Sequence, residues 1–170
     1  MKQPLNLFVS IILTVFVLPP VILANTAAIE KVISGDRVQI KGWEIVRLTG
    51  IIAPAPDEPF GQEALAFTKS ELEGKLVVIA TYSIDNTAAG IVRDPEGLCM
   101  VHIEYGSDVT GKGKKSGGIS ETVDFNALLL EKGLARIDEE YLPEFLEFYR
   151  EIEAKAKEQK TGIWSVETAE

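Results

Sequence analysis

G-D-R-V-Q-I (Gly35 to Ile40) and V-R-L-T-G-I-I-A-P-A-P-D-E-P-F-G-Q-E-A (Val46 to Ala64) are the stretches that decide the fold. The first holds a tight Gly35-Asp36 turn followed by alternating polar and apolar residues, which predicts a strand leaving a turn. The second continues a strand, passes through a proline-rich loop and enters a helical pattern. Together these stretches predict strands that lead, through a proline-rich loop, into one helix.

Strand and helix patterns continue on both sides of these stretches. A helix is expected from Gln62 to Glu73, ended by Gly74, and a shorter one from Phe125 to Lys132 with Asp124 as its N-cap. Apolar residues at helical spacing near the C-terminus predict a last helix, which Gly162 closes; they are Leu142, Phe145, Leu146, Tyr149, Ile152 and Ala156. Strands are expected at residues 28–34, 37–40, 43–52, 75–81 and 98–105, with an extended segment at 134–137.

This order of elements indicates the fold class. A helix after the third of five strands, with further helices after the fifth, is typical of a small closed Greek-key barrel of the OB type. The sequence therefore predicts an α+β fold: a five-stranded OB-like β-barrel with three helices. One domain is expected over residues 28–166, followed by a short tail at residues 167–170.

Two further stretches complete a family pattern. They are D-F-N-A-L-L-L-E-K-G-L-A-R-I (Asp124 to Ile137) and E-A-K-A-K-E-Q-K-T-G-I-W-S (Glu153 to Ser165). With the stretches quoted first, they make the chain resemble the thermonuclease, or staphylococcal nuclease-like, family over about residues 28–166. Within these signatures we expect Asn126 to hydrogen-bond nearby backbone and Trp164 to bury its ring, so both are structural residues.

The resemblance implies a calcium-dependent phosphodiesterase site that this chain keeps only in part. In the family, two aspartates and a backbone carbonyl bind calcium, a glutamate lies beside the attacking water, and two arginines contact phosphate. Asp36 matches the first aspartate and Arg47 the first arginine. The second aspartate, the glutamate and the second arginine are replaced by Ile52, Ala55 and Leu98.

These substitutions remove most of the expected chemistry. Losing a general base costs about 10²- to 10⁴-fold in rate, and losing a charge-stabilising donor costs about 10²- to 10³-fold. One carboxylate is also a poor calcium site, because calcium gathers several oxygen ligands. The sequence predicts a non-catalytic nuclease homologue that acts as a binding or scaffold module and needs no cofactor. Asp36 and Arg47 are then expected either to pair with each other or to keep a residual phosphate contact.

An alternative keeps the enzyme active through displaced residues. Asp57 and Glu58 follow the substituted glutamate position closely, and Arg93 precedes the substituted arginine position. If these side chains took over the missing roles, the chain would be a calcium-dependent extracytoplasmic nuclease for DNA or RNA. A simpler interpretation is a solvated acidic loop.

Other candidate chemistry is weaker. Cys99 and His102 are the chain's single cysteine and histidine, and three residues apart on a strand they point to opposite faces, so they make no zinc site. We expect Cys99 to be buried and His102 to be half-exposed. Lys112, Lys114 and Lys115 lie in a glycine-rich segment, which predicts a flexible basic loop able to contact phosphate or an acidic partner.

The N-terminus and the net charge indicate where the protein is located and which class of partner it binds. Residues 1–27 carry a short apolar run with Lys2 as the only charge, which predicts a signal peptide, or a membrane anchor through residues 4–24 if it is not cleaved. The folded part is then secreted, periplasmic or held outside the cytoplasm. A net charge of −9 disfavours nucleic acid, so a protein or envelope component is the expected partner.

Overall fold

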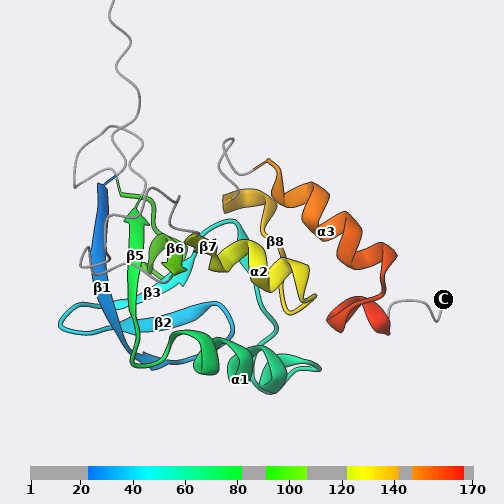
Figure 1. Ribbon diagram of the computed structural model, residues 1–170, viewed down its shortest axis with the longest axis horizontal. Helices are drawn as coiled ribbons and strands as arrows, with labels where there is room; N and C mark the ends of the chain where they lie inside the picture. The colour runs from blue at the N-terminus through cyan, green and yellow to red at the C-terminus, as the bar shows by residue number, and fades with distance from the viewer. Residues whose placement is uncertain (1–22, 82–90, 107–121, 142–146, 167–170) are drawn as a thin grey trace, which may run out of the picture.

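Five strands close into a barrel in the computed structural model, which describes residues 23–81, 91–106, 122–141 and 147–166 (Figure 1). The neighbour order is β3-β2-β1-β5-β6, and a parallel pairing between β3 and β6 joins the two ends. All other pairs in the barrel are antiparallel. The barrel strands are β1 (Leu23–Val32), β2 (Arg37–Ile40), β3 (Ile45–Leu48), β5 (Leu76–Thr81) and β6 (Cys99–Gly106).

Three short strands lie outside the barrel. β7 (Thr122–Asp124) extends the sheet beyond β6. β4 (Ile51–Ile52) and β8 (Arg136–Ile137) form a separate two-stranded ladder. This ladder brings the residues after β3 beside the residues after the second helix, which are far apart in the sequence.

Three helices complete the fold. α1 (Gly61–Leu72) lies below the barrel, whereas α2 (Phe125–Glu131) and α3 (Tyr149–Glu158) lie side by side at its flank (Figure 1). Two 3₁₀ turns, η2 (Glu139–Tyr141) and η4 (Gly162–Ser165), precede and follow α3. The core between barrel and helices is apolar; its fully buried members include Val38, Val46, Leu48, Ile51, Leu72, Val77, Ile103, Phe125 and Leu129. The predicted α+β, OB-like barrel with three helices is confirmed.

Two glycines fix the C-terminal turn against the loop after α2. Gly133 and Gly162 both have positive φ, and a Cβ on either would lie 2.1 Å from a backbone oxygen of the facing segment. The amide of Ile163 also donates to the carbonyl of Gly133 over 2.9 Å. Only glycine allows this approach, because any side chain would force the two backbones apart.

Several element boundaries differ from the expectation. β1 begins at Leu23 rather than at residue 28, and its first half pairs with β5. The expected third strand is divided into β3 and β4, because Gly50 adopts φ 72° and bends the chain between them. The last helix ends at Glu158, so Gly162 opens the following turn instead of closing the helix.

The prediction for His102 was wrong. This residue is 7% exposed, and Tyr149 of α3 lies against its ring. Its Nδ1 lies 3.3 Å from the hydroxyl of Tyr149, which donates to both oxygens of Asp124, and burial raises the pKa of the Asp124 carboxyl. Cys99 is buried as expected, and Asp124 caps α2 by accepting from the amide of Ala127.

Some predictions fall on residues that the structure does not describe. These are residues 1–22 of the leader expected over residues 1–27, the basic loop with Lys112, Lys114 and Lys115, residues 142–146 of the expected last helix, and the tail at 167–170. Among the described residues, no helix has the length and apolar character needed to cross a bilayer.

The candidate cleft beside Asp36

A cavity of about 350 Å³ opens between the β1–β2 turn and the proline-rich loop. Four positions that the sequence singled out line this cavity: Asp36, Ile52, Ala55 and Glu58. The other residues that line it are Ile33, Ser34, Arg37, Ala53 and Pro56.

The carboxylate of Asp36 is held by hydrogen bonds from neighbouring residues. It is 4% exposed, its Oδ1 accepts a hydrogen bond from the hydroxyl of Ser34 at 2.7 Å, and its Oδ2 accepts one from the amide of Ala53 at 3.3 Å. Each oxygen thus has a protein donor and fixes the turn before β2 to the strand end at Ala53.

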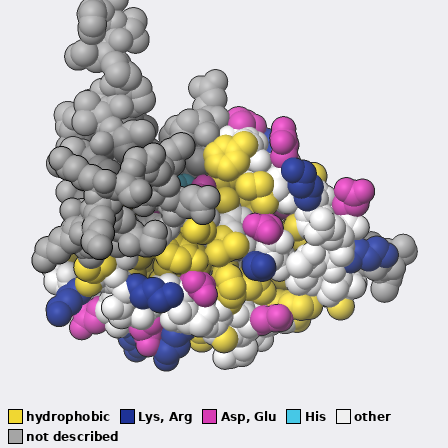
Figure 2. Space-filling view, viewed as in Figure 1, with side chains coloured by type: hydrophobic (Ala, Val, Ile, Leu, Met, Phe, Trp, Pro, Cys, Tyr) yellow, Lys and Arg dark blue, Asp and Glu magenta, His cyan; other side chains and the backbone are white. Residues whose placement is uncertain are grey.

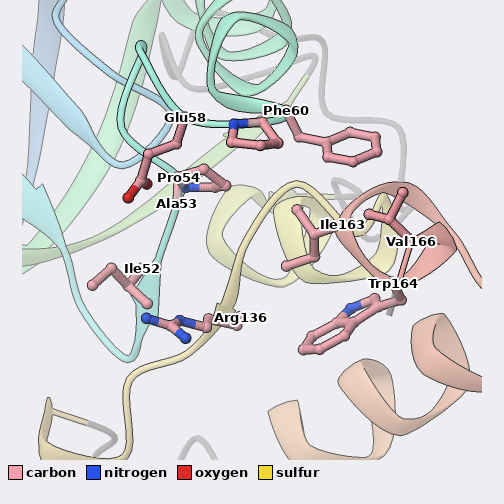
Figure 3. Close-up of a pocket in the computed structure, with 10 residues that line it drawn as sticks. Ile52, Ala53, Pro54, Glu58, Phe60, Arg136, Ile163, Trp164 and Val166 are labelled. Atoms are coloured by element: carbon pink, nitrogen blue, oxygen red, sulfur yellow. The ribbon is translucent and has the colours of Figure 1, made fainter. Parts of the chain in front are cut away.

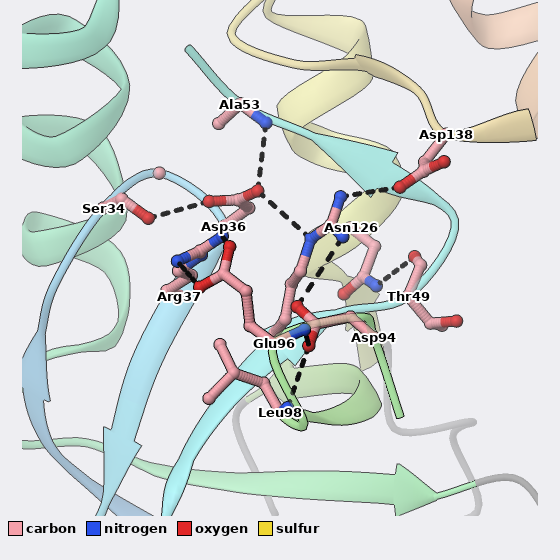
Figure 4. A network of polar contacts seen from close by, with 12 residues as sticks. Ser34, Asp36, Arg37, Thr49, Ala53, Asp94, Glu96, Leu98, Asn126 and Asp138 are labelled. Carbon is pink, nitrogen blue, oxygen red and sulfur yellow. Dashed lines mark hydrogen bonds and ion pairs between the residues drawn. The ribbon is translucent and has the colours of Figure 1, made fainter. Parts of the chain in front are cut away.

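Arg47 lies among three carboxylates. Figure 4 labels these carboxylates, which belong to Asp36, Asp94 and Asp138. Its Nη2 is 2.6 Å from Oδ2 of Asp138, its Nη1 is 3.8 Å from Oδ2 of Asp94, and its Nε is 3.7 Å from Oδ2 of Asp36. Arg47 is 6% exposed, and the ring of Tyr141 lies 5.9 Å from its guanidinium carbon. The expected pairing of Arg47 with Asp36 is present, but the shortest contact is to Asp138.

The turn before β6 holds Leu98 in place of the second arginine. Asp94 is buried, and its Oδ1 accepts from the amides of Glu96 and Leu98 at 2.9 and 2.8 Å. Arg37 donates to both carboxylate oxygens of Glu96, and these hydrogen bonds hold the pKa of Glu96 below its usual value. Asp94 therefore shapes the turn, while the aliphatic side chain of Leu98 offers no charge to a phosphate.

The structure brings only one of the three displaced candidates to the cleft. Glu58 lines the cavity, and its Oε2 accepts the amide of Ala55 at 2.7 Å. Asp57 is exposed and does not line it. Arg93 is paired instead with Glu44, at 2.9 and 3.0 Å.

The residues at the cleft do not fit calcium. Calcium takes six to eight oxygen ligands, typically several of them carboxylate. Asp36 and Glu58 are the carboxylates that line the cavity, and each already accepts a backbone amide. Within the described ranges, no three His, Cys, Asp or Glu side chains converge in a way that would hold a metal ion.

Sequence reasoning missed the partners of Arg47 and Arg37. Asp138 is 91 residues from Arg47, and Glu96 is 59 residues from Arg37. No local spacing signals such pairs, because they form only when the barrel and the β4–β8 ladder assemble. Asp94 lies in the stretch D-P-E-G-L (Asp94 to Leu98), where no local spacing indicates that it neighbours Arg47.

Charges on the face shown in Figure 2 are mixed. Acidic and basic side chains stand singly around a central area of hydrophobic side chains, and neither sign gathers into a patch. A phosphate backbone is bound best by clustered lysines and arginines.

Comparison with known proteins gives one family. The sequence model of the staphylococcal nuclease homologue family matches residues 45–166. Proteins named probable endonuclease LCL3 are similar to this chain. The one from Debaryomyces hansenii is 31% identical over 132 residues, covering 72% of this chain and 48% of the relative. The one from Clavispora lusitaniae is 32% identical over 132 residues, covering 72% of this chain and 48% of the relative. The one from Scheffersomyces stipitis is 30% identical over 145 residues, covering 77% of this chain and 52% of the relative.

The chain spans about half the length of the curated relatives it matches. The matched region contains β3 with Arg47, the proline-rich loop, α1, β5, β6 and the C-terminal helices, and it covers more than half of the chain; β1, β2 and Asp36 precede it. The chain belongs to the staphylococcal nuclease homologue family.

Proposed function

We propose that this chain is a nuclease-family domain that does not cleave nucleic acid and serves, outside the cytoplasm, as a binding or scaffold module for a protein or envelope component. The observation that supports this most is the side-chain chemistry of the cleft. Ile52 and Ala55 line the cleft with hydrocarbon side chains at the positions where the family resemblance implies an aspartate and a glutamate. Neither side chain binds a cation or takes a proton from water.

The state of Arg47 supports the same proposal. A phosphate-binding arginine must direct uncommitted N–H groups toward the ligand. Here the guanidinium is buried, with one short contact to Asp138 and two further carboxylates within 4 Å. A phosphate would have to displace these carboxylates, and it would meet their negative charge at close range.

One observation favours the alternative of an active nuclease. Glu58 lines the same cavity as Asp36, and its Oε1 makes no hydrogen bond to a described residue. In that case Glu58 takes the role of the base that orients water, with Asp36 as the remaining acid. This site still lacks a second metal-binding carboxylate and a cation at Leu98, so we rank it second.

One assay separates the two functions. The purified protein is incubated with single-stranded DNA and with RNA, with calcium or with a chelator, and products are resolved on a gel. The proposal predicts no chelator-sensitive product. Cleavage that requires calcium and disappears in Glu58→Gln, but persists in the matched surface variant Glu63→Gln, would establish the alternative.

A further inference from the structure

We propose that a second groove, which shares Ile52, Ala53 and Glu58 with the Asp36 cleft, binds an extended peptide segment of a partner protein that combines bulky apolar residues with an acidic residue. This inference rests on the proposed function and names the surface that carries it. The groove has a volume of about 440 Å³, within the range of pre-formed ligand sites. Its lining comes from the proline-rich loop, β8 and the C-terminal turn: Ile52, Ala53, Pro54, Glu58, Pro59, Phe60, Arg136, Ile163, Trp164 and Val166.

The groove has one polar end and one apolar end. Figure 3 shows the guanidinium of Arg136 close to Ile52 at one end, with Phe60, Ile163 and Val166 at the other. The proline-rich loop forms one wall and the C-terminal turn the other. An amphipathic ligand would lie with its apolar part between the two walls and its charge at Arg136.

Arg136 supplies an uncommitted cation. It is exposed, and its guanidinium makes no hydrogen bond or ion pair with any residue that the structure describes. The other arginines all have carboxylate partners; they are Arg37, Arg47, Arg93 and Arg150. In a chain of net charge −9, a free arginine in an apolar groove is complementary to one ligand carboxylate, which it can hold through two parallel hydrogen bonds.

Glu58 explains why the ligand should be a peptide. Its Oε2 accepts the amide of Ala55, whereas its Oε1 has no donor among the described residues. A peptide backbone offers an N–H to this oxygen and a side-chain carboxylate to Arg136. A fatty acid or another simple amphiphile would offer only the carboxylate.

Trp164 provides a second unmet hydrogen-bonding group. Trp164 is 8% exposed and lines the groove, and its buried indole N–H has no hydrogen-bond partner among the described residues. Buried donors in folded proteins are nearly always paired, so an unpaired one next to a groove indicates an acceptor that arrives with a ligand. A peptide carbonyl is such an acceptor.

The test uses two peptides, acetyl-Leu-Phe-Glu-amide and its neutral counterpart acetyl-Leu-Phe-Gln-amide, titrated into the purified full-length protein. Binding is followed by the indole N–H signals in ¹H–¹⁵N NMR spectra. The chain has 2 tryptophans, and Trp43 lies outside the groove, so its signal is an internal control for non-specific effects. We expect the Glu peptide to shift the Trp164 signal and to leave that of Trp43 unchanged.

Variants of Arg136 test the carboxylate contact. Arg136→Gln should weaken binding of the Glu peptide about tenfold, as for loss of a charge-assisted hydrogen bond, and leave the Gln peptide unchanged. Arg136→Glu should favour acetyl-Leu-Phe-Lys-amide over the Glu peptide. Lys155→Gln, an exposed charge change outside the groove, should match the wild-type protein. Because Arg136 is exposed, these variants should fold normally.

Two results would overturn the groove assignment. One is no shift of Trp164 at millimolar peptide, and the other is equal binding of the Glu and Gln peptides that Arg136→Gln does not alter. Neither result concerns cleavage of nucleic acid. Conversely, calcium-dependent cleavage with intact peptide binding would overturn the proposed function but would not contradict the groove as a peptide-binding site. The two failures can therefore be distinguished.

Discussion

Ile52 and Arg136 stand directly opposite each other in the ladder between β4 and β8. Side chains that oppose each other across an antiparallel pair lie on the same face, so an aliphatic side chain and a guanidinium are neighbours at the edge of the cleft. The family resemblance implies a metal-binding aspartate at the position of Ile52. A carboxylate placed there would form an ion pair with Arg136, and this ion pair would compete with metal binding.

This neighbour bears on any attempt to rebuild the site. Ile52→Asp, Ala55→Glu and Leu98→Arg together should give weak calcium binding, because they return two acids and a cation to the cleft. Adding Arg136→Gln should tighten it several-fold, since the new carboxylate no longer has a cross-strand cation as a competing partner. Isothermal titration with calcium measures both variants. Equal affinity with and without Arg136, or no binding in either, would contradict this account of the cleft.

Arg47 should be a major determinant of stability. Arg47→Met removes the only cation placed among Asp36, Asp94 and Asp138 in this buried region of the described structure, and should cost about 3–5 kcal/mol of unfolding free energy. The matched control is Arg93→Met, which removes an arginine paired with Glu44 at the surface and should change stability little. Urea unfolding gives both values, and similar losses in the two variants would refute the special position of Arg47.

Asn126 should contribute to stability through its hydrogen bonds to buried backbone groups. It is fully buried, its Oδ1 accepts the amide of Ile103 at 3.2 Å, and its Nδ2 donates to the carbonyl of Thr49 at 3.0 Å. Asn126→Leu should cost about 2–4 kcal/mol, because two buried backbone groups lose their partner. The same unfolding experiment measures it. A change below about 1 kcal/mol would mean that these backbone groups find other partners.

Cys99 should be inert in the native protein. Its side chain is fully buried, and burial raises the pKa of the thiol from 9.0 to about 11. Below pH 9 the thiol is protonated in both states and contributes nothing to the pH dependence. Between pH 9 and about 11 the unfolded state ionises first, so the wild-type protein should lose stability relative to Cys99→Ala. Alkylation by iodoacetamide should be slow until urea unfolds the protein, and rapid labelling without denaturant would contradict the burial.

The sequence predicted those features that depend on local pattern. The Gly35-Asp36 turn, the helix that begins after the proline-rich loop, and the cap at Asp124 follow from residues close together in the chain. The roles of Asn126 and Trp164 were also predicted correctly, since both are buried structural side chains. The substituted positions at the cleft could be identified because their spacing is fixed by one strand and one loop.

Features that depend on how distant segments meet were not predicted. Asp138 reaches Arg47 because β8 pairs with β4, and the buried His102 contacts Tyr149, which is 47 residues away in the sequence. The division of the long third strand at Gly50 follows from a positive φ, which sequence alternation does not reveal. The groove at Arg136 has the same origin, because its two walls come from residues about 100 positions apart in the chain.

The contact between Gly133 and Gly162 has a consequence for how this surface can evolve. The approach of the C-terminal turn to the loop after α2 depends on two missing Cβ atoms and one main-chain amide, and the buried Trp164 is the turn's structural side chain. Residues exposed on that turn can therefore diverge freely while the wall they form keeps its distance from the proline-rich loop. Related proteins could bind peptides of quite different sequence on an unchanged backbone, provided that both of these positions stay glycine.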